Sequence, residues 1–234
     1  MAGQTLDGIR VLELAQGVAG PYCGKLFADF GAEVVKLEPP GGDPQRQAVV
    51  VPGDRPDLEQ GAAFLHLNTN KRSIVADPEA PEGVNLIRRL VASSDLVIES
   101  YAPGTLDGWG LGFEALREVQ PSLVLASVTA FGQTGPYADY VGEEIVHYAM
   151  GGPMYATGLV EREPVKLGGN IIQMQCGNMA ATAALAALMT ARGDGGEAIH
   201  VDISNFETQA GSIDRPCRRN IHSASAIAQL PVSA

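Results

Sequence analysis

The sequence is poor in cysteine and in basic residues, and each shortage excludes a class of protein. Only three cysteines occur in 234 residues. Cys23, Cys176 and Cys217 lie too far apart to predict a disulfide framework or a zinc site. Sixteen lysines and arginines stand against twenty-seven aspartates and glutamates, for a net charge of −11. This balance argues against a nucleic-acid partner, because affinity for the phosphate backbone begins with a basic surface.

The signals of a secreted, membrane-bound or metal-binding protein are also lacking. Residues 1–15 contain no basic region followed by an apolar core, so we expect no signal peptide. The longest apolar run is too short and too rich in alanine to span a bilayer. His66, His147, His200 and His222 lie in separate segments without ligand spacing, so we expect no metal. These absences predict a cytoplasmic protein with no membrane partner.

A regular alternation of apolar strands and helices fills the first part of the chain. Residues 9–15 and 33–40 are apolar strands on either side of a helix that follows a glycine turn, which predicts a βαβ unit. The same pattern predicts further strands at 71–77, 95–101 and 123–131, separated by helices that include one over 105–121. We therefore expect an α/β fold, a Rossmann-like, mostly parallel sheet with helices on both faces.

The later part of the chain continues this pattern and then loses it. We expect a helix that ends at Gly151, an alanine-rich helix within residues 166–189, a strand over 198–204 and another helix from residue 205. After Arg215 the sequence has no clear period. The prediction is one domain over residues 1–213, followed by a divergent tail or truncated end over 214–234.

The first turn between strand and helix does not match a dinucleotide fingerprint. Gly17, Gly20 and Gly24 do not fit GxGxxG, and Pro21 stands where a phosphate-cradling turn needs a backbone donor. A plain NAD-binding protein is therefore disfavoured. The topology still places a ligand crevice at the carboxyl ends of the strands.

Two pairs of charged residues have both a structural and a functional interpretation. Lys71 and Arg72 open a strand, either as a solvated turn or as cations that hold a phosphate. Glu143 and Glu144 open a helix, where negative charge suits the helix dipole. Each pair could equally belong to a site.

Four stretches together resemble the class III coenzyme A transferases, a family that also includes carnitine dehydratase-like proteins and α-methylacyl-CoA racemases. They are LDGIRVLELAQGVAGPYCGKLFADFGAEVVKLEPPGGDPQR, LNTNKRSIVAD, SDLVIESYAPGTLDGWGLGFEALREVQPSLVLASVTAFGQTGPYADY and RGDGGEAIHVDISNFETQ. The resemblance covers about residues 5–213 and implies that this segment is a CoA-binding large domain. It also implies a second domain, which we expect to be missing here.

The resemblance implicates specific residues in binding CoA. In this family the first turn after a strand and the NKRS-like loop hold the adenine and phosphate portion, and the ESYAPG-like segment lies along the pantetheine arm. The residues implicated in the first group are Val18, Ala19, Asn70, Lys71 and Arg72, and those in the second are Ser100 and Tyr101.

The catalytic position departs from the family. Its transferases use an aspartate nucleophile four residues before a helix glycine, which corresponds here to Gly177, so the nucleophile position is Gln173. A neutral amide cannot form the acyl anhydride that such a nucleophile forms. The histidine of the racemases corresponds to Glu143, and Glu144 matches an acidic position common to both branches.

Three interpretations follow from this departure. The protein binds acyl-CoA without transferring it, or a relocated carboxylate, Glu144 or Glu143, performs transfer or proton chemistry. Alternatively, Gln173 orients a thioester carbonyl for hydration or isomerisation. The resemblance as a whole implies a CoA-transferase that uses coenzyme A as acyl-CoA, a carboxylic acid acceptor and no metal, and that forms a homodimer when its full fold is present.

Overall fold

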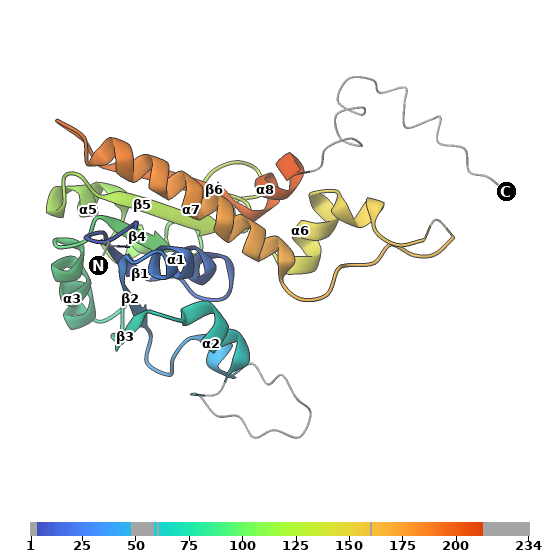
Figure 1. Cartoon of the computed structure of the whole chain (residues 1–234), viewed down its shortest axis with the longest axis horizontal. Helices are drawn as coiled ribbons and strands as arrows, with labels where there is room; N and C mark the ends of the chain where they lie inside the picture. The colour runs from blue at the N-terminus through green and yellow to red at the C-terminus, as the bar shows by residue number, and fades with distance from the viewer. Residues whose placement is uncertain (1–3, 48–58, 60, 160, 213–234) are drawn as a thin grey trace.

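Six parallel strands form one sheet in the order β3-β2-β1-β4-β5-β6, which Figure 1 shows at the centre of the molecule. They are β1 (Arg10–Glu13), β2 (Glu33–Glu38), β3 (Arg72–Val75), β4 (Leu96–Glu99), β5 (Val124–Thr129) and β6 (Ile199–Ser204). β1 pairs with both β2 and β4, so the order of the strands reverses between β1 and β4. This is the order of a doubly wound, Rossmann-like sheet, and it confirms the predicted fold class.

The computed structural model describes residues 4–47, 59, 61–159 and 161–212. The predicted domain boundary after residue 213 and the tail over 214–234 lie outside the described residues, as do Cys217 and His222. The division of the chain into these two parts stays a prediction.

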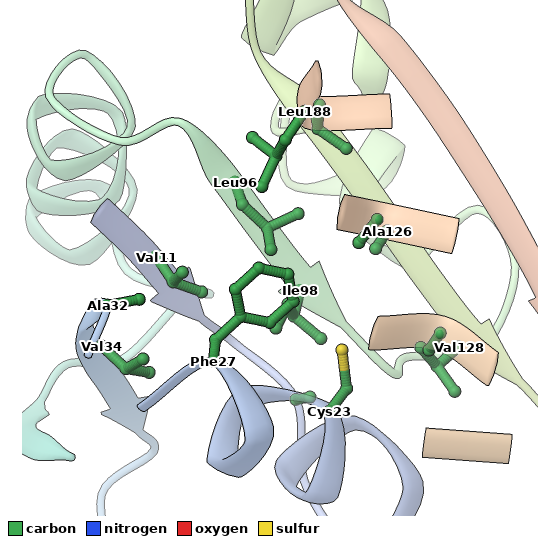
Figure 2. Packing of buried hydrophobic residues seen from close by; sticks show 14 of the residues in the cluster. Val11, Cys23, Phe27, Ala32, Val34, Leu96, Ile98, Ala126, Val128 and Leu188 are labelled. Carbon is green, nitrogen blue, oxygen red and sulfur yellow. The ribbon is translucent and has the colours of Figure 1, made fainter. Parts of the chain in front are cut away.

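Helices cover both faces of the sheet, and each face has its own apolar core. On one face α1 (Ala19–Asp29) and the long α7 (Ile171–Ala191) pack against each other and against the strands. Figure 2 shows Phe27 and Cys23 of α1 among side chains of the strands in this core. The other face is covered by α3 (Pro81–Val91), α4 (Thr105–Gly108) and α5 (Phe113–Val119).

Small residues let α7 approach α1 closely. A Cβ atom at Gly177 would lie 2.6 Å from the backbone oxygen of Ala19 and 3.0 Å from Cβ of Tyr22. Real Cβ atoms do not approach backbone oxygen that closely, so glycine is required here. α7 is thus held in direct contact with the first turn of α1.

Within the described residues, α7 is the helix with the length and apolar composition to cross a membrane. Its buried residues Cys176, Ala180, Ala184 and Leu188 recur every four positions and belong to the core that α1 shares. This spacing is that of a helix which packs one face against a sheet. α7 is therefore a core helix of the domain.

Two elements differ from the sequence prediction. The helix expected over 105–121 is broken into α4 and α5 at Gly110, which has a φ of 70°. The short helix α2 (Ala62–Asn68), which lies before β3, was not predicted. The expected helix that ends at Gly151 is α6 (Glu144–Met150), and the remaining elements are η1 (Pro44–Gln47), η2 (Pro153–Ala156) and α8 (Asn205–Ser212).

Candidate active site

A cavity of about 460 Å³ opens at the carboxyl edge of the sheet, where the strand order reverses between β1 and β4. Open α/β sheets bind their ligands at this point, because the loops after the two strands diverge there. Its lining comes from the turns after β1 and β4, the end of β5, the loop over 138–142 and the four helices α1, α6, α7 and α8. The lining residues include Gln16, Ala19, Ser100, Tyr101, Thr129, Asp139, Tyr140, His147, Gln173 and Asn205.

Four residues that the sequence implicated come together in this cavity: Ala19, Ser100, Tyr101 and Gln173. Ser100 joins the two turns, because its hydroxyl accepts a hydrogen bond from the Gln16 N–H at 2.9 Å and lies 3.2 Å from the Gln16 carbonyl oxygen. The Tyr101 ring packs edge-on against Trp109 with centroids 4.9 Å apart. The wall predicted to follow the pantetheine arm is thus held in place by hydrogen bonds and aromatic packing.

Glu144 lies beside the cavity without lining it. Its carboxylate is buried and accepts hydrogen bonds from the backbone N–H groups of Ile172, at 2.8 Å, and Gln173, at 3.2 Å. These N–H groups belong to the first turn of α7, where a helix has no internal acceptors for them. Glu144 therefore caps α7 from a neighbouring helix and fixes the backbone of Gln173. Glu143 is exposed and also lies outside the cavity lining.

Val18, Asn70 and Arg72 also lie outside the cavity lining. Val18 is buried at the start of α1. The Asn70 side-chain amide donates to Asp29 at 2.9 Å, and the exposed Arg72 guanidinium pairs with Glu33 at 2.8 Å. Asn70 and Arg72 therefore lie at the outer edge of the sheet, next to α1 and β2.

Lys71 is buried in a network of charges under α1. Its ammonium group lies 2.7 Å from Oε2 of Glu13 and donates to the Pro21 carbonyl at 2.8 Å and to Asn68 Oδ1 at 2.9 Å. Lys36 binds the other oxygen of Glu13 at 3.0 Å. Burial lowers the pKa of Lys71, and Glu13 opposes that effect. Because these contacts surround the ammonium group and its side chain is only 2% exposed, the geometry does not favour a direct phosphate contact by Lys71.

The cavity also contains side chains that sequence reasoning did not select. His147 was interpreted as structural, and Asp139 and Asn205 were not considered. One feature of the sequence could have pointed to His147 as a site residue. It lies three residues after Glu144, which puts both side chains on one face of α6. Asp139 and Asn205 lie in a loop and directly after a strand, and their spacing gave no signal.

A second polar cluster lies on the opposite face of the sheet, under α4. Burial raises the pKa of Glu99 to about 7, while hydrogen bonds from Ser127 and the Tyr101 N–H oppose that effect. The Ser127 hydroxyl lies 2.8 Å from Nε2 of His200, and these side chains line a small cavity of about 30 Å³. Through Tyr101, Glu99 is connected to the wall of the larger cavity.

Among the described residues, no group of three or more His, Cys, Asp or Glu side chains is arranged to hold a metal ion. The features present are a doubly wound parallel sheet, a cavity at its switch point and polar groups from the turns after β1 and β4 and from α7. They place the protein in the class of doubly wound α/β domains with a ligand-sized cavity at the switch point of the sheet.

The chain belongs to CoA-transferase family III, whose model matches residues 6–223. It is 44% identical over 203 residues to succinyl-CoA–D-citramalate CoA-transferase of Chloroflexus aurantiacus, a match that covers 86% of this chain and 49% of that protein. It is 42% identical over 210 residues to succinate–glutarate CoA-transferase of Agrobacterium fabrum, covering 88% of this chain and 52% of the relative. The chain therefore spans about half the length of the curated relatives it matches.

Solved structures show the same relationship. A CAIB/BAIF family protein from Brucella suis superposes with a TM-score of 0.86 at 39% identity, covering 95% of this chain and 59% of that one. A Mycobacterium tuberculosis protein superposes with a TM-score of 0.82 at 32% identity, covering 95% of this chain and 60% of the other. The family resemblance inferred from the four sequence stretches is confirmed.

Proposed function

We propose that this chain is the CoA-binding part of a CoA-transferase that moves CoA between two carboxylic acids, and that its cavity receives the thioester end of an acyl-CoA. One observation carries the proposal. Ala19, Ser100, Tyr101 and Gln173 come from three separate parts of the sequence, and they line one cavity at the switch point of the sheet. A volume of about 460 Å³ is within the usual range of small-molecule sites.

We propose dicarboxylic acids as the substrate class. Two relatives are named for succinyl-CoA with D-citramalate and for succinate with glutarate, and all of these acids carry two carboxyl groups. The identity of 42–44% over most of this chain supports carrying over the class, although not the individual acid.

The adenine and phosphate portion of CoA would lie along the start of α1, at Val18 and Ala19, and toward Asn70 and Arg72. Contacts between the loop and the helix support this placement, because Asn70 binds Asp29 of α1 and Lys71 binds the Pro21 carbonyl in its first turn. In this proposal Lys71 positions the loop, and Arg72 is the exposed cation available to a phosphate.

Transfer requires a carboxylate nucleophile, and Gln173 does not supply one. Asp139 is the only carboxylate among the described residues that line the cavity, and it is exposed there. We propose Asp139 as the relocated nucleophile, ahead of Glu143 and of Glu144, whose oxygens both bind the α7 backbone. Gln173 would then orient the thioester carbonyl as a hydrogen-bond donor.

The proposed steps balance without a further reactant. The Asp139 carboxylate attacks the acyl carbonyl, the C–S bond breaks, and an aspartyl–acyl anhydride forms with release of CoA thiolate. The thiolate attacks the aspartyl carbonyl, which releases the acyl group as a carboxylate and leaves an aspartyl–CoA thioester. The acceptor carboxylate then reverses these two steps and leaves as its CoA thioester.

The second candidate function is acyl-CoA binding without transfer, and the neutral amide of Gln173 favours it. Mass spectrometry distinguishes the two functions. The protein is incubated with succinyl-CoA, isotope-labelled succinate and hydroxylamine, which traps acyl adducts. Transfer predicts exchange of label and an adduct on Asp139, both lost in Asp139→Asn. An adduct on Glu143 would move the nucleophile there, and CoA binding with no exchange would leave the binding function.

We also propose the homodimer that the family resemblance implies. Apolar side chains are exposed on the two helices beside the cavity, at Ile145 and Met150 of α6 and at Met179 and Met189 of α7. Such side chains gathered on neighbouring elements commonly mark an interface. Light scattering across a range of protein concentrations would show a monomer mass throughout if this proposal is wrong.

A further inference from the structure

The wall of the cavity contains two buried polar side chains with unpartnered atoms, the two ring nitrogens of His147 and Oδ1 of Asn205. We propose that His147 and Asn205 form a subsite that binds a carboxylate of the substrate together with a proton. The inference rests on the proposed function, because the ligand offered to this subsite is the second carboxylate of the acyl group or of the acceptor acid.

Burial without partners is the first observation. His147 is 2% exposed and Asn205 is 7% exposed. Both ring nitrogens of His147 and Oδ1 of Asn205 lack a hydrogen-bond partner among the described residues. Buried polar groups rarely lack partners, because burial removes their hydrogen bonds to water and an unpaired group destabilises the fold. A ligand that supplies the missing partners would remove this cost.

The position of the two side chains is the second observation. The His147 ring packs against Phe131 with centroids 5.5 Å apart, and its Nε2 lies so near Gly142 that a side chain there would overlap it. Gly142 belongs to the loop that lines the cavity. Asn205 is held beside the end of β5, because the next N–H, of Phe206, donates to the Ala130 carbonyl at 3.1 Å. Both side chains line the same cavity.

The charges around the cavity indicate that the ligand is a carboxylate. Its binding would be accompanied by protonation of His147. Neither lysine nor arginine is among the described residues that line the cavity. His147 is therefore the side chain there that can become positively charged beside a carboxylate. The unpartnered atom of Asn205 is the acceptor Oδ1, so the side-chain amide must turn its NH₂ group toward the carboxylate to donate a second hydrogen bond.

The titration of His147 follows from its surroundings. Burial lowers the pKa of His147 to about 4, so the free protein holds it neutral at pH 7. The titratable groups that line the cavity with His147 are Tyr101, Asp139 and Tyr140, and Glu144 of its own helix is bound to the α7 backbone. The facing side chains of β5 and α8, Thr129 and Asn205, do not titrate.

A bound carboxylate would raise the pKa of His147, since an opposite charge stabilises the imidazolium. Protons are then taken up on binding at any pH between the two pKa values. In that window the affinity for the acid falls about tenfold for each unit of pH increase. A subsite that used a fixed cation would take up no proton when the carboxylate binds.

Succinate is the probe for the test, with the full 234-residue chain. NMR of the histidine Cε1–H resonances gives the titration of each of the four histidines, and His147→Gln assigns the relevant signal. Saturating succinate should raise the titration midpoint of His147 by at least about one pH unit. His147→Gln and Asn205→Ala should each weaken succinate binding by about tenfold or more. The control His66→Gln, on an exposed face of α2, should change neither result.

An unchanged midpoint, or equal succinate affinity in His147→Gln, would overturn the inference. If His147→Gln does not fold, two measurements still test the inference. They are the shift of the His147 titration midpoint in the wild-type protein and the succinate affinity of Asn205→Ala. A titration with CoA itself separates this inference from the proposed function. Binding of CoA without any succinate effect refutes the subsite alone, whereas a succinate effect without CoA binding refutes the proposed function alone.

Discussion

The Glu144 carboxylate accepts a hydrogen bond from the backbone N–H of Gln173, at 3.2 Å, across two helices that are 20 residues apart in the chain. The acid that sequence comparison offered as a substitute nucleophile therefore holds the helix on which the nucleophile position lies. Its second oxygen binds the Ile172 N–H at 2.8 Å. Glu144 is a positioning residue in this geometry, and the nucleophile that we propose is therefore Asp139, which lines the cavity.

Replacing Glu144 by glutamine should destabilise the start of α7. An amide has one acceptor oxygen, so it cannot serve both N–H groups, and its NH₂ group would face other donors. We expect the free energy of unfolding to fall by about 1–2 kcal/mol. Urea denaturation measures this change. Glu143→Gln, at the exposed neighbour, is the matched control, and equal effects of the two variants would contradict the capping role.

Lys71→Ala should destabilise the protein more than Arg72→Ala does. Removing the Lys71 ammonium leaves the buried Glu13 carboxylate with Lys36 as its remaining ionic contact. Loss of one partner of a buried ion pair costs about 3 kcal/mol or more. The exposed Arg72 pairs with Glu33 at the surface, and its removal should cost about 0.5 kcal/mol or less.

Calorimetric titration with CoA tests the proposed phosphate contact of Arg72. If Arg72 is the cation that meets a phosphate, Arg72→Ala should lower CoA affinity while leaving the urea midpoint nearly unchanged. Retained affinity in Arg72→Ala would remove that assignment.

Gly177→Ala should disrupt the contact between α7 and α1. The added methyl group would meet the Ala19 carbonyl oxygen at 2.6 Å, and backbone cannot move away as a flexible side chain can. Overpacking of this kind costs about 1–3 kcal/mol. Gly211→Ala is the control, because a Cβ there meets nothing within 4 Å in α8. A thermal midpoint for Gly177→Ala as high as that of the control would show that the helices can separate without cost.

Stability should depend on pH through Glu99. Its pKa is raised from 4.5 to about 7 in the folded protein, so folding favours its protonated form. The resulting stability is present at low pH and is lost as the pH rises through 7. Glu99→Gln keeps a neutral group of the same shape next to Ser127. Between pH 5 and pH 8 the wild type should therefore lose about 2 kcal/mol relative to this variant.

Urea unfolding of both proteins at several pH values measures this difference. Glu118→Gln, on an exposed part of α5, provides the comparison. A constant difference in unfolding free energy between wild type and Glu99→Gln would mean that Glu99 is ionised in the fold throughout this range.

The sheet was predictable because its signals are local. β4 and β5 are buried along their whole lengths, and central strands of a parallel sheet appear in sequence as continuous apolar runs. α2 was missed because only Phe64 and Leu67 of its seven residues are buried, which is too few to give a helical period. The break at Gly110 depends on a positive φ, and a glycine within an amphipathic stretch does not reveal its own φ.

The site was only partly predictable because its contacts are not local. Ser100, Tyr101 and Gln173, which the family resemblance implicated, line one cavity in the structure, and their roles stay predictions. Lys71 looked like a free cation, since its partner Glu13 lies far away in sequence on another strand. His147 and Asn205 were selected as a candidate subsite because they have buried atoms without hydrogen-bond partners. Missing hydrogen bonds cannot be recognised in a sequence.

Calorimetric titration of succinyl-CoA into the wild-type protein and into Gln173→Trp tests most directly whether the cavity receives the thioester. An indole at position 173 would occupy space inside the cavity lining, while the rest of the helix could fold unchanged. We predict that the wild type binds succinyl-CoA and that Gln173→Trp binds it at least about tenfold more weakly, with an unaltered thermal midpoint. Equal affinities, or no binding by the wild type, would contradict the account.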